Sequence, residues 1–146
     1  MKLWFNLLCR DVEAQLDFYA RLLRWPEAVR ARSPIYRALE HDGVQFGFNA
    51  LPAYALLGLD DRRPEASSPA PVTAYATFML ATPAEVDDAA ARTAALGGRI
   101  VKPPYPTYYG QWQAVLSDPE RHVFRVAATT LPDGVAPAPA PSALPA

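Results

Sequence analysis

The sequence predicts an α+β fold built from two modules that share one order of elements: a strand, a helix and three further strands. A stretch rich in charge, proline and serine, residues 59–72, divides the chain into two parts of similar size. Each part places one segment with helical spacing among segments with strand-like patterns. We expect module one at 1–58, a linker at 59–72 and module two at 73–130, together forming a single domain over 1–130. Residues 131–146 are rich in proline and alanine and are expected to be disordered.

The first half opens with an apolar run at residues 2–9, which is typical of a buried strand. Asp11 can cap the helix that follows at 12–25, where apolar residues recur every three or four positions. The Asp42-Gly43 pair is a strong hairpin signal, because both residues tolerate the left-handed conformation that such turns need. Three strands are expected after the helix, at residues 27–32, 35–43 and 44–50.

The second half repeats this order, with a strand at 72–81 and a helix at 84–96. Thr82 and Glu85 have the spacing of a capping box, in which each side chain satisfies a backbone N–H at the start of the helix. Gly97 and the glycine after it indicate where the helix ends. Three more strands are expected, at residues 99–104, 110–118 and 122–128.

The two predicted helices can be aligned at an offset of 74 residues, which places Val12 on Val86 and Leu22 on Leu96. Few residues are identical between the halves, so the repeat lies in the order of elements more than in the sequence itself. The composition leaves enough apolar residues, 51% of the chain, for one core of ordinary size.

Composition and charge exclude several classes of protein. The net charge is −1, without the basic footprint of a nucleic-acid-binding protein. No apolar run approaches the ~18 residues that a membrane span needs, and the N-terminus lacks a signal-peptide pattern. The single cysteine, Cys9, excludes an intrachain disulfide and fits a reducing compartment. We therefore expect a cytoplasmic protein without a nucleic-acid or membrane partner, in which Cys9 is a buried strand residue.

The sequence lacks the G-x-S-x-G elbow, the phosphate-binding glycine loop and the C-x-x-C pair. His41 lies beside the predicted turn and is expected in solvent. Strand alternation places His122 on the opposite face from Arg125, so it is expected to flank a turn and not to bind a metal. Asp87 and Asp88 are expected on the solvated face of the second helix.

Three segments together resemble the vicinal oxygen chelate (VOC) superfamily, which includes glyoxalase I, bleomycin-resistance proteins and extradiol dioxygenases. They read "LLCRDVEAQLDFYARLLRW", "AEVDDAAARTAALGGRIVKPP" and "YYGQWQAVLSDPERHVFRVA". The resemblance covers about residues 2–128 and depends on the order and spacing of the segments. It implies two βαβββ modules that form a curled mixed sheet around a cavity, and it implies a homodimer.

Metal-using members of this superfamily carry their ligands on the first and fourth strands of each module. The resemblance puts these positions at Trp4, Gly47, Tyr75 and Arg125 in this chain. Divalent metals prefer imidazole and carboxylate ligands. Tryptophan and glycine offer neither, tyrosine is a poor ligand, and arginine carries a fixed positive charge. The resemblance therefore implies a cavity without metal, and no cofactor is expected.

Strand alternation, counted from Trp4 and Arg125, predicts the side chains that face the cavity. The predicted ligand-binding residues are Trp4, Asn6, Gln45, Asn49, Tyr75, Thr77, Tyr108, Trp112 and Arg125. Met79 is expected on the same face, and Tyr105 and Tyr109 near its rim. Such a surface suits stacking on a flat or apolar molecule with a few oriented hydrogen bonds, although these aromatic residues are also typical of a core or a dimer interface.

Arg125 allows two interpretations. A buried guanidinium needs a partner, because burying an unpaired charge is costly. One candidate is a carboxylate or phosphate of a bound ligand. The other is a structural ion pair, for which Glu40 on the predicted third strand is a plausible partner.

Three functions fit this pattern. The first is a protein that binds a small aromatic or anionic molecule in a metal-free cavity, as the resemblance to bleomycin-resistance proteins implies. The second is an enzyme of the same superfamily, a lyase, isomerase or dioxygenase with unconventional metal ligands or metal-free chemistry. The third is a non-catalytic dimer scaffold.

Overall fold

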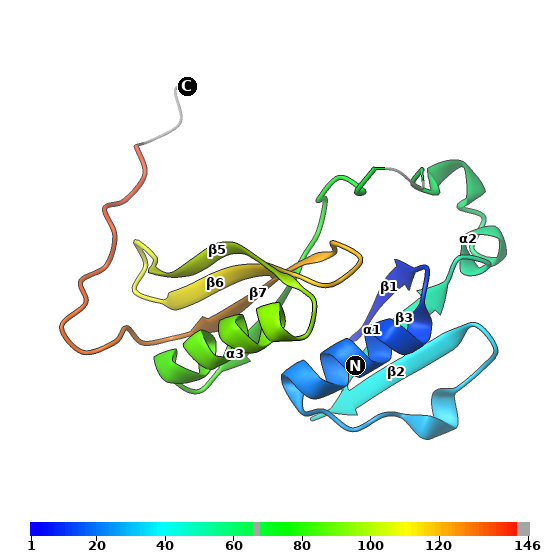
Figure 1. Cartoon of the computed structure of the whole chain (residues 1–146), viewed down its shortest axis with the longest axis horizontal. Coiled ribbons are helices and arrows are strands. Elements are labelled where there is room, and N and C mark those ends of the chain that lie inside the picture. The colour runs from blue at the N-terminus through cyan, green and yellow to red at the C-terminus, as the bar shows by residue number, and fades with distance from the viewer. Residues whose placement is uncertain (66–67, 143–146) are drawn as a thin grey trace. The chain divides into compact units, whose positions relative to one another are not determined.

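A computed structural model describes residues 1–65 and 68–142 of the chain (Figure 1). The chain forms two compact units, Met1–Pro71 and Val72–Ala146, and each is described by itself. Both units combine a helix with a β-sheet, which confirms the predicted α+β class. Within the described residues, no helix is both long and apolar enough to cross a bilayer.

The first unit contains a three-stranded sheet in the order β1-β3-β2. Its strands and helices are β1 (Trp4–Cys9), α1 (Val12–Leu23), η1 (Val29–Ala31), β2 (Tyr36–His41), β3 (Val44–Ala50), α2 (Ala53–Leu56) and η2 (Asp60–Arg62). Strand β1 pairs with β3 in parallel, and β2 pairs with β3 antiparallel. The predicted hairpin between the last two strands is confirmed, since Asp42 and Gly43 both have positive φ angles, 47° and 78°.

Helix α1 begins where the sequence predicts it. The Asp11 carboxylate accepts the backbone N–H groups of Glu13 and Ala14 at 3.1 and 2.9 Å, so it satisfies two of the donors that a helix start leaves free. Tyr19 of the helix stacks on Phe48 and meets Phe46 edge-on. These contacts fix the side of the sheet that is buried, and the alternate β3 residues therefore point away from the helix.

The strand predicted at 27–32 is not formed. Glu27 makes only an isolated bridge with Leu39, and within residues 27–32 the last backbone hydrogen bond to β2 is that of the Ala28 N–H to the Ala38 carbonyl. Beyond it the chain turns into the 3₁₀ helix η1, closed by a bond from the Ala31 N–H to the Ala28 carbonyl. This tight turn uses the backbone groups that a longer strand would have paired with β2.

The second unit contains a four-stranded sheet in the order β4-β7-β6-β5. Its elements are β4 (Ala76–Leu80), α3 (Pro83–Ala95), β5 (Arg99–Pro106), β6 (Trp112–Ser117) and β7 (Val123–Ala128). Strand β4 runs parallel to β7, while β5, β6 and β7 are antiparallel neighbours. Helix α3 lies along one face of this sheet (Figure 1).

Both ends of α3 follow the sequence signals. The capping box of Thr82 and Glu85 is confirmed. At the other end the Gly98 N–H donates to the Thr93 carbonyl and the Gly97 N–H to the Ala94 carbonyl. This is a Schellman motif, for which Gly97 supplies a φ of 90°.

The repeat between the units has an offset of 71 residues, not 74. The helix caps Asp11 and Thr82 are 71 positions apart, and at this offset every buried residue of α3 falls on a buried residue of α1. The predicted alignment was wrong by three residues. A shift of three is close to one helical turn, so it moves the apolar stripe onto nearly the same face.

Segments outside the two sheets follow irregular courses. The predicted linker includes η2, and its residues 66–67 lie outside the described part of the chain. Residues 131–142 form neither helix nor strand, although the Ala138 N–H donates to the Thr107 carbonyl at 3.2 Å. Residues 143–146 of the predicted tail lie outside the described residues.

Candidate functional site

The face of the second sheet that points away from α3 is set by the strand register. Thr77 pairs with Arg125, Arg125 with Val115, and Val115 with Lys102, so these four residues form one row across four strands. Paired residues point to the same side of a sheet. We call this side the Arg125 face; it includes Thr77, Met79, Lys102, Tyr105, Gln113, Val115 and Arg125.

Arg125 is held by neighbours on this face. Its Nε donates to the Thr77 hydroxyl at 3.1 Å, and one Nη donates to the Tyr109 hydroxyl at 3.4 Å. The guanidinium carbon lies 5.3 Å from the centre of the Tyr75 ring, which permits a cation–π contact. A guanidinium has five N–H groups. The other three have no hydrogen-bond acceptor among the described residues of the second unit, and Arg125 forms no ion pair there.

A chain of hydrogen bonds extends from Arg125 toward β5. The Tyr109 hydroxyl donates to Gln113 Oε1 at 3.0 Å, and Gln113 Nε2 donates to the Tyr105 hydroxyl. Lys102 Nζ lies 3.5 Å from the centre of the Tyr105 ring. The buried amide of Gln113 thus uses both its donor and its acceptor to fix two tyrosines. Sequence reasoning missed Gln113, although period-two alternation from Arg125 across the antiparallel partner would have found it.

The other predicted residues of the second unit divide into two groups. Tyr75 and Met79 are about half exposed, and Tyr108 meets Tyr109 edge-on with ring centres 4.9 Å apart. Trp112, in contrast, pairs with Ala128 on the α3 side, and its indole N–H donates to the Asp87 carboxylate at 2.8 Å. Trp112 therefore lies on the α3 side of the sheet, and its predicted place near the cavity rim is wrong. Asp87, which was expected to be solvated, accepts this hydrogen bond from a strand residue.

In the first unit the predicted residues Asn6, Gln45 and Asn49 meet around a tyrosine that sequence reasoning missed. The Tyr36 hydroxyl lies 3.2 Å from Asn6 Oδ1 and 3.0 Å from Gln45 Oε1. Asn49 Nδ2 donates to the same Asn6 oxygen at 3.5 Å. Tyr36 pairs with Asn49 across β2 and β3, so counting the alternation along β2 as well would have placed it on this face.

Gly47 makes room for this cluster. A Cβ atom at Gly47 would lie closer than 3.0 Å to the side chains of Asn6 and Tyr36, so only glycine leaves space for the tyrosine hydroxyl above the strand. Burial raises the pKa of Tyr36 above its ordinary value of 10.0. The hydroxyl is a neutral donor at neutral pH, and the raised pKa extends its protonated range further into alkaline pH. Trp4, at the start of β1, is 60% exposed.

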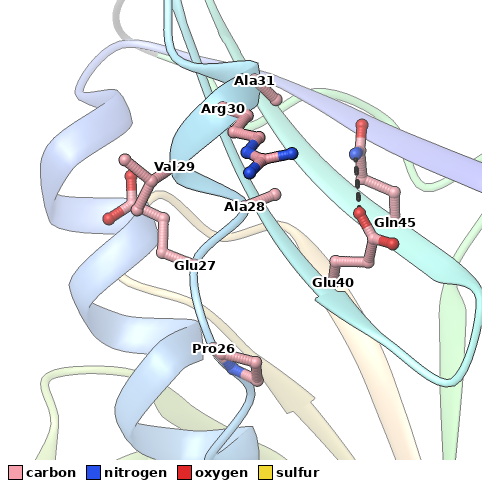
Figure 2. Close-up of a pocket in the computed structure, with 8 residues that line it drawn as sticks. All are labelled: Pro26, Glu27, Ala28, Val29, Arg30, Ala31, Glu40 and Gln45. Carbon is pink, nitrogen blue, oxygen red and sulfur yellow. Dashed lines mark hydrogen bonds between the residues drawn. The ribbon is translucent and has the colours of Figure 1, made fainter.

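A hollow of about 550 Å³ opens beside this cluster, between residues 26–31 and the end of the hairpin (Figure 2). Gln45, only 5% exposed, lies in its wall and donates to Glu40 Oε2 at 3.4 Å. Arg30 extends toward Glu40 and Gln45, whereas Glu27 points away from them (Figure 2). Two carboxylates, Glu27 and Glu40, and one guanidinium, Arg30, line the hollow, so it lacks the single-sign character of the Arg125 face.

The two histidines take the roles expected for turn residues. His122 Nδ1 lies 2.9 Å from Asp118 Oδ2, and the His122 N–H donates to the other oxygen of the same carboxylate at 3.0 Å. Asp118, 1% exposed, thus closes the turn before β7. His41 is exposed and lies 3.3 Å from Asp42. Cys9 is buried, as predicted, with its sulfur 3.5 Å from the Asn49 carbonyl.

The four positions that the resemblance assigns to metal ligands do not fit a divalent ion. At Gly47 the Tyr36 hydroxyl occupies the space of a side chain, and at Arg125 a guanidinium is fixed on Thr77. Trp4 and Tyr75 add no imidazole or carboxylate. Within residues 1–65 and 68–142, no three His, Cys, Asp or Glu side chains gather closely enough to hold a metal.

Comparison with protein families gives a match over residues 3–127 to the model described as a glyoxalase-like domain. The chain belongs to this family. Its resemblance to the VOC superfamily is thereby confirmed, and so is the α+β fold expected from it, apart from the missing strand of the first unit. Comparison with curated protein sequences gives no match.

Solved structures agree with this assignment. A "glyoxalase/bleomycin resistance protein/dioxygenase family enzyme" from Burkholderia phytofirmans PsJN is 35% identical, with a TM-score of 0.80 over 86% of this chain and 96% of that one. A glyoxalase-related enzyme from Fulvimarina pelagi is 20% identical, with a TM-score of 0.70 over 88% and 87%. A lactoylglutathione lyase from Agrobacterium tumefaciens is 16% identical, with a TM-score of 0.61 over 88% and 92%. The last two share the fold alone.

Proposed function

We propose that this glyoxalase-like domain binds a small aromatic anion, without a metal ion, on the Arg125 face of its second unit. The main support for the proposal is the incomplete hydrogen bonding of the Arg125 guanidinium within the described residues of the second unit. The guanidinium is partly buried and fixed through Nε, yet three of its N–H groups have no acceptor in the described part of that unit. A carboxylate would accept two of them in a bidentate pair.

The surroundings of Arg125 favour an aromatic body on the ligand. Tyr75, Tyr108 and Tyr109 are each about half exposed. Tyr75 and Tyr109 contact the guanidinium, and Tyr108 meets the Tyr109 ring edge-on. Exposed aromatic rings offer large apolar contact areas at low entropic cost. The name of the 35% identical structure from Burkholderia phytofirmans includes bleomycin resistance proteins, the part of the family that this proposal follows. The predicted cytoplasmic location and homodimer remain part of the proposal.

Thermal unfolding in the presence of benzoate tests this function, with benzamide as the neutral control of the same shape. A ligand at ten times its Kd stabilises the folded state by about 1.4 kcal/mol, which raises the Tm of a domain of this size by roughly 3–6 °C. We expect this shift for wild type with benzoate, none with benzamide, and none for Arg125→Ala. An unchanged shift in Arg125→Ala would make Arg125 a structural residue and contradict the proposal.

The metal-free part of the proposal has a test of its own. We expect elemental analysis of the purified protein to find far less than one equivalent of divalent metal per chain. One equivalent that disappears when Tyr75 or Asn6 is changed to alanine would show that these residues hold an ion, and would favour a metal-dependent enzyme instead.

A further inference from the structure

We infer that the ligand of the Arg125 face is a dianion whose second acidic group binds Lys102. This inference deepens the proposed function and rests on it. The register places Arg125 on β7 and Lys102 on β5 in the same row, with Val115 of β6 between them. All three residues therefore point to the same side of the sheet.

The spacing of the two cations suits a molecule with an acid at each end. Neighbouring strands lie about 4.8 Å apart, so the Cα atoms of Arg125 and Lys102 are separated by roughly 10 Å. Their long side chains can reach inward over Val115, which is apolar and partly exposed. An aromatic ring can rest on Val115 while its two acidic groups extend to the two cations.

The charges on this face also favour a ligand with two negative charges. Arg99 pairs with Ser117 on the same side of the sheet, so a third cation lies in the next row. None of the strand residues on this face is an aspartate or glutamate. Within residues 72–142, Lys102 forms no ion pair, and its ammonium group rests over the Tyr105 ring. A ligand with two negative charges matches this surface better than one with a single charge.

Tyr105 contacts Lys102 and is connected to Arg125 through a series of hydrogen bonds. Its ring lies under the ammonium group, and its hydroxyl accepts a hydrogen bond from Gln113, which in turn accepts one from Tyr109. Tyr109 is also the acceptor for Arg125. The two cations are thus held by one connected set of side chains, and this gives the row a defined geometry for a ligand of matching length.

Isothermal titration with terephthalate and with its monomethyl ester tests the inference, because the two ligands differ by one negative charge on the same ring. An exposed ion pair contributes at most about 1 kcal/mol, which corresponds to a factor of roughly five in Kd. We expect terephthalate to bind wild type about fivefold more tightly than the ester. Lys102→Met should reduce this difference to the statistical advantage of the two equivalent carboxylates of terephthalate and leave the Kd of the ester unchanged. Lys102→Arg should retain the full difference.

Arg121→Asn is the matched control, since it removes the same charge from the exposed turn before β7 and asparagine tolerates the positive φ found there. It should retain the fivefold preference. Equal affinity of both ligands for wild type, or a preference of undiminished size in Lys102→Met, would overturn the dianion inference and leave the Arg125 site intact. Absence of binding by either ligand would overturn both proposals.

Discussion

Arg125 donates a hydrogen bond of 3.1 Å from Nε to the hydroxyl of Thr77, the residue opposite it in the parallel pair of β4 and β7. In the first unit, the parallel pair of β1 and β3 places Asn6 opposite Gly47. The corresponding place in the two units therefore holds different pairs. In the second unit a hydroxyl, from Thr77, faces the Arg125 guanidinium, and in the first unit an amide, from Asn6, faces Gly47. Neither pair offers the imidazole and carboxylate ligands of a metal site.

Gly47→Ala should destabilise the first unit. The added Cβ would lie closer than 3.0 Å to Asn6 and Tyr36, so the tyrosine must move and its hydrogen bonds are disturbed. We expect the free energy of unfolding in urea to fall by about 1–3 kcal/mol. In a Tyr36→Ala background the same substitution should cost clearly less, because one of the two neighbours is gone. Equal costs in both backgrounds would contradict this account of the glycine.

Two buried glutamines should respond in opposite ways to replacement by leucine. Gln15 of α1 is 1% exposed, and neither of its side-chain polar atoms has a hydrogen-bond partner among the described residues. Because an unpaired buried amide is unfavourable, Gln15→Leu should raise the free energy of unfolding by about 1–2 kcal/mol.

Gln113 is the matched control, since it is also buried but bonds two tyrosines. Gln113→Leu should lower the free energy of unfolding by about 1–3 kcal/mol. Chemical denaturation of both variants measures the two effects. Destabilisation by Gln15→Leu would mean that this amide has a partner in the folded protein.

The stability of the protein should decrease at alkaline pH in part through Tyr36. Burial raises the pKa of this residue above 10.0 in the folded state, so the folded protein holds the phenolic proton more tightly than the unfolded chain does. The corresponding stability is fully present below pH 10 and is lost as pH rises toward the folded-state pKa. Tyr36→Phe should flatten this decrease in unfolding measurements across that range. An identical pH profile would show that Tyr36 ionises as freely in the folded protein as in the unfolded chain.

The sequence was sufficient to predict the architecture because the signals for helix ends and turns are local. The helix caps form hydrogen bonds with neighbouring residues, at Asp11 and at Thr82 with Glu85. The hairpin turn depends on the φ angles of two adjacent residues, Asp42 and Gly43. The strand predicted at 27–32 is absent because the chain turns into η1 after Ala28, and the strand-like pattern of these residues does not reveal that turn. The helix offset failed because amphipathic patterns look alike after a shift of nearly one turn.

Sequence reasoning predicted which side of each sheet the candidate residues lie on, but not which of them contact one another. Alternation placed Asn6, Gln45, Thr77 and Arg125 correctly on the sides opposite the helices. It could not place Trp112, since the start of β6 was uncertain and a slip of one residue reverses the face. Tyr36 and Gln113 were missed because they lie on strands that do not carry the superfamily's ligand positions.

Above all, we propose that the Arg125 guanidinium binds an anion. A crystal structure of the protein soaked with benzoate tests this most directly. We expect the benzoate carboxylate at hydrogen-bond distance from the Nη atoms of Arg125, with Nε still on Thr77 and the ring beside Tyr75 or Tyr109. A guanidinium already paired with a protein carboxylate, such as that of Glu40, and benzoate absent from this face would contradict the claim.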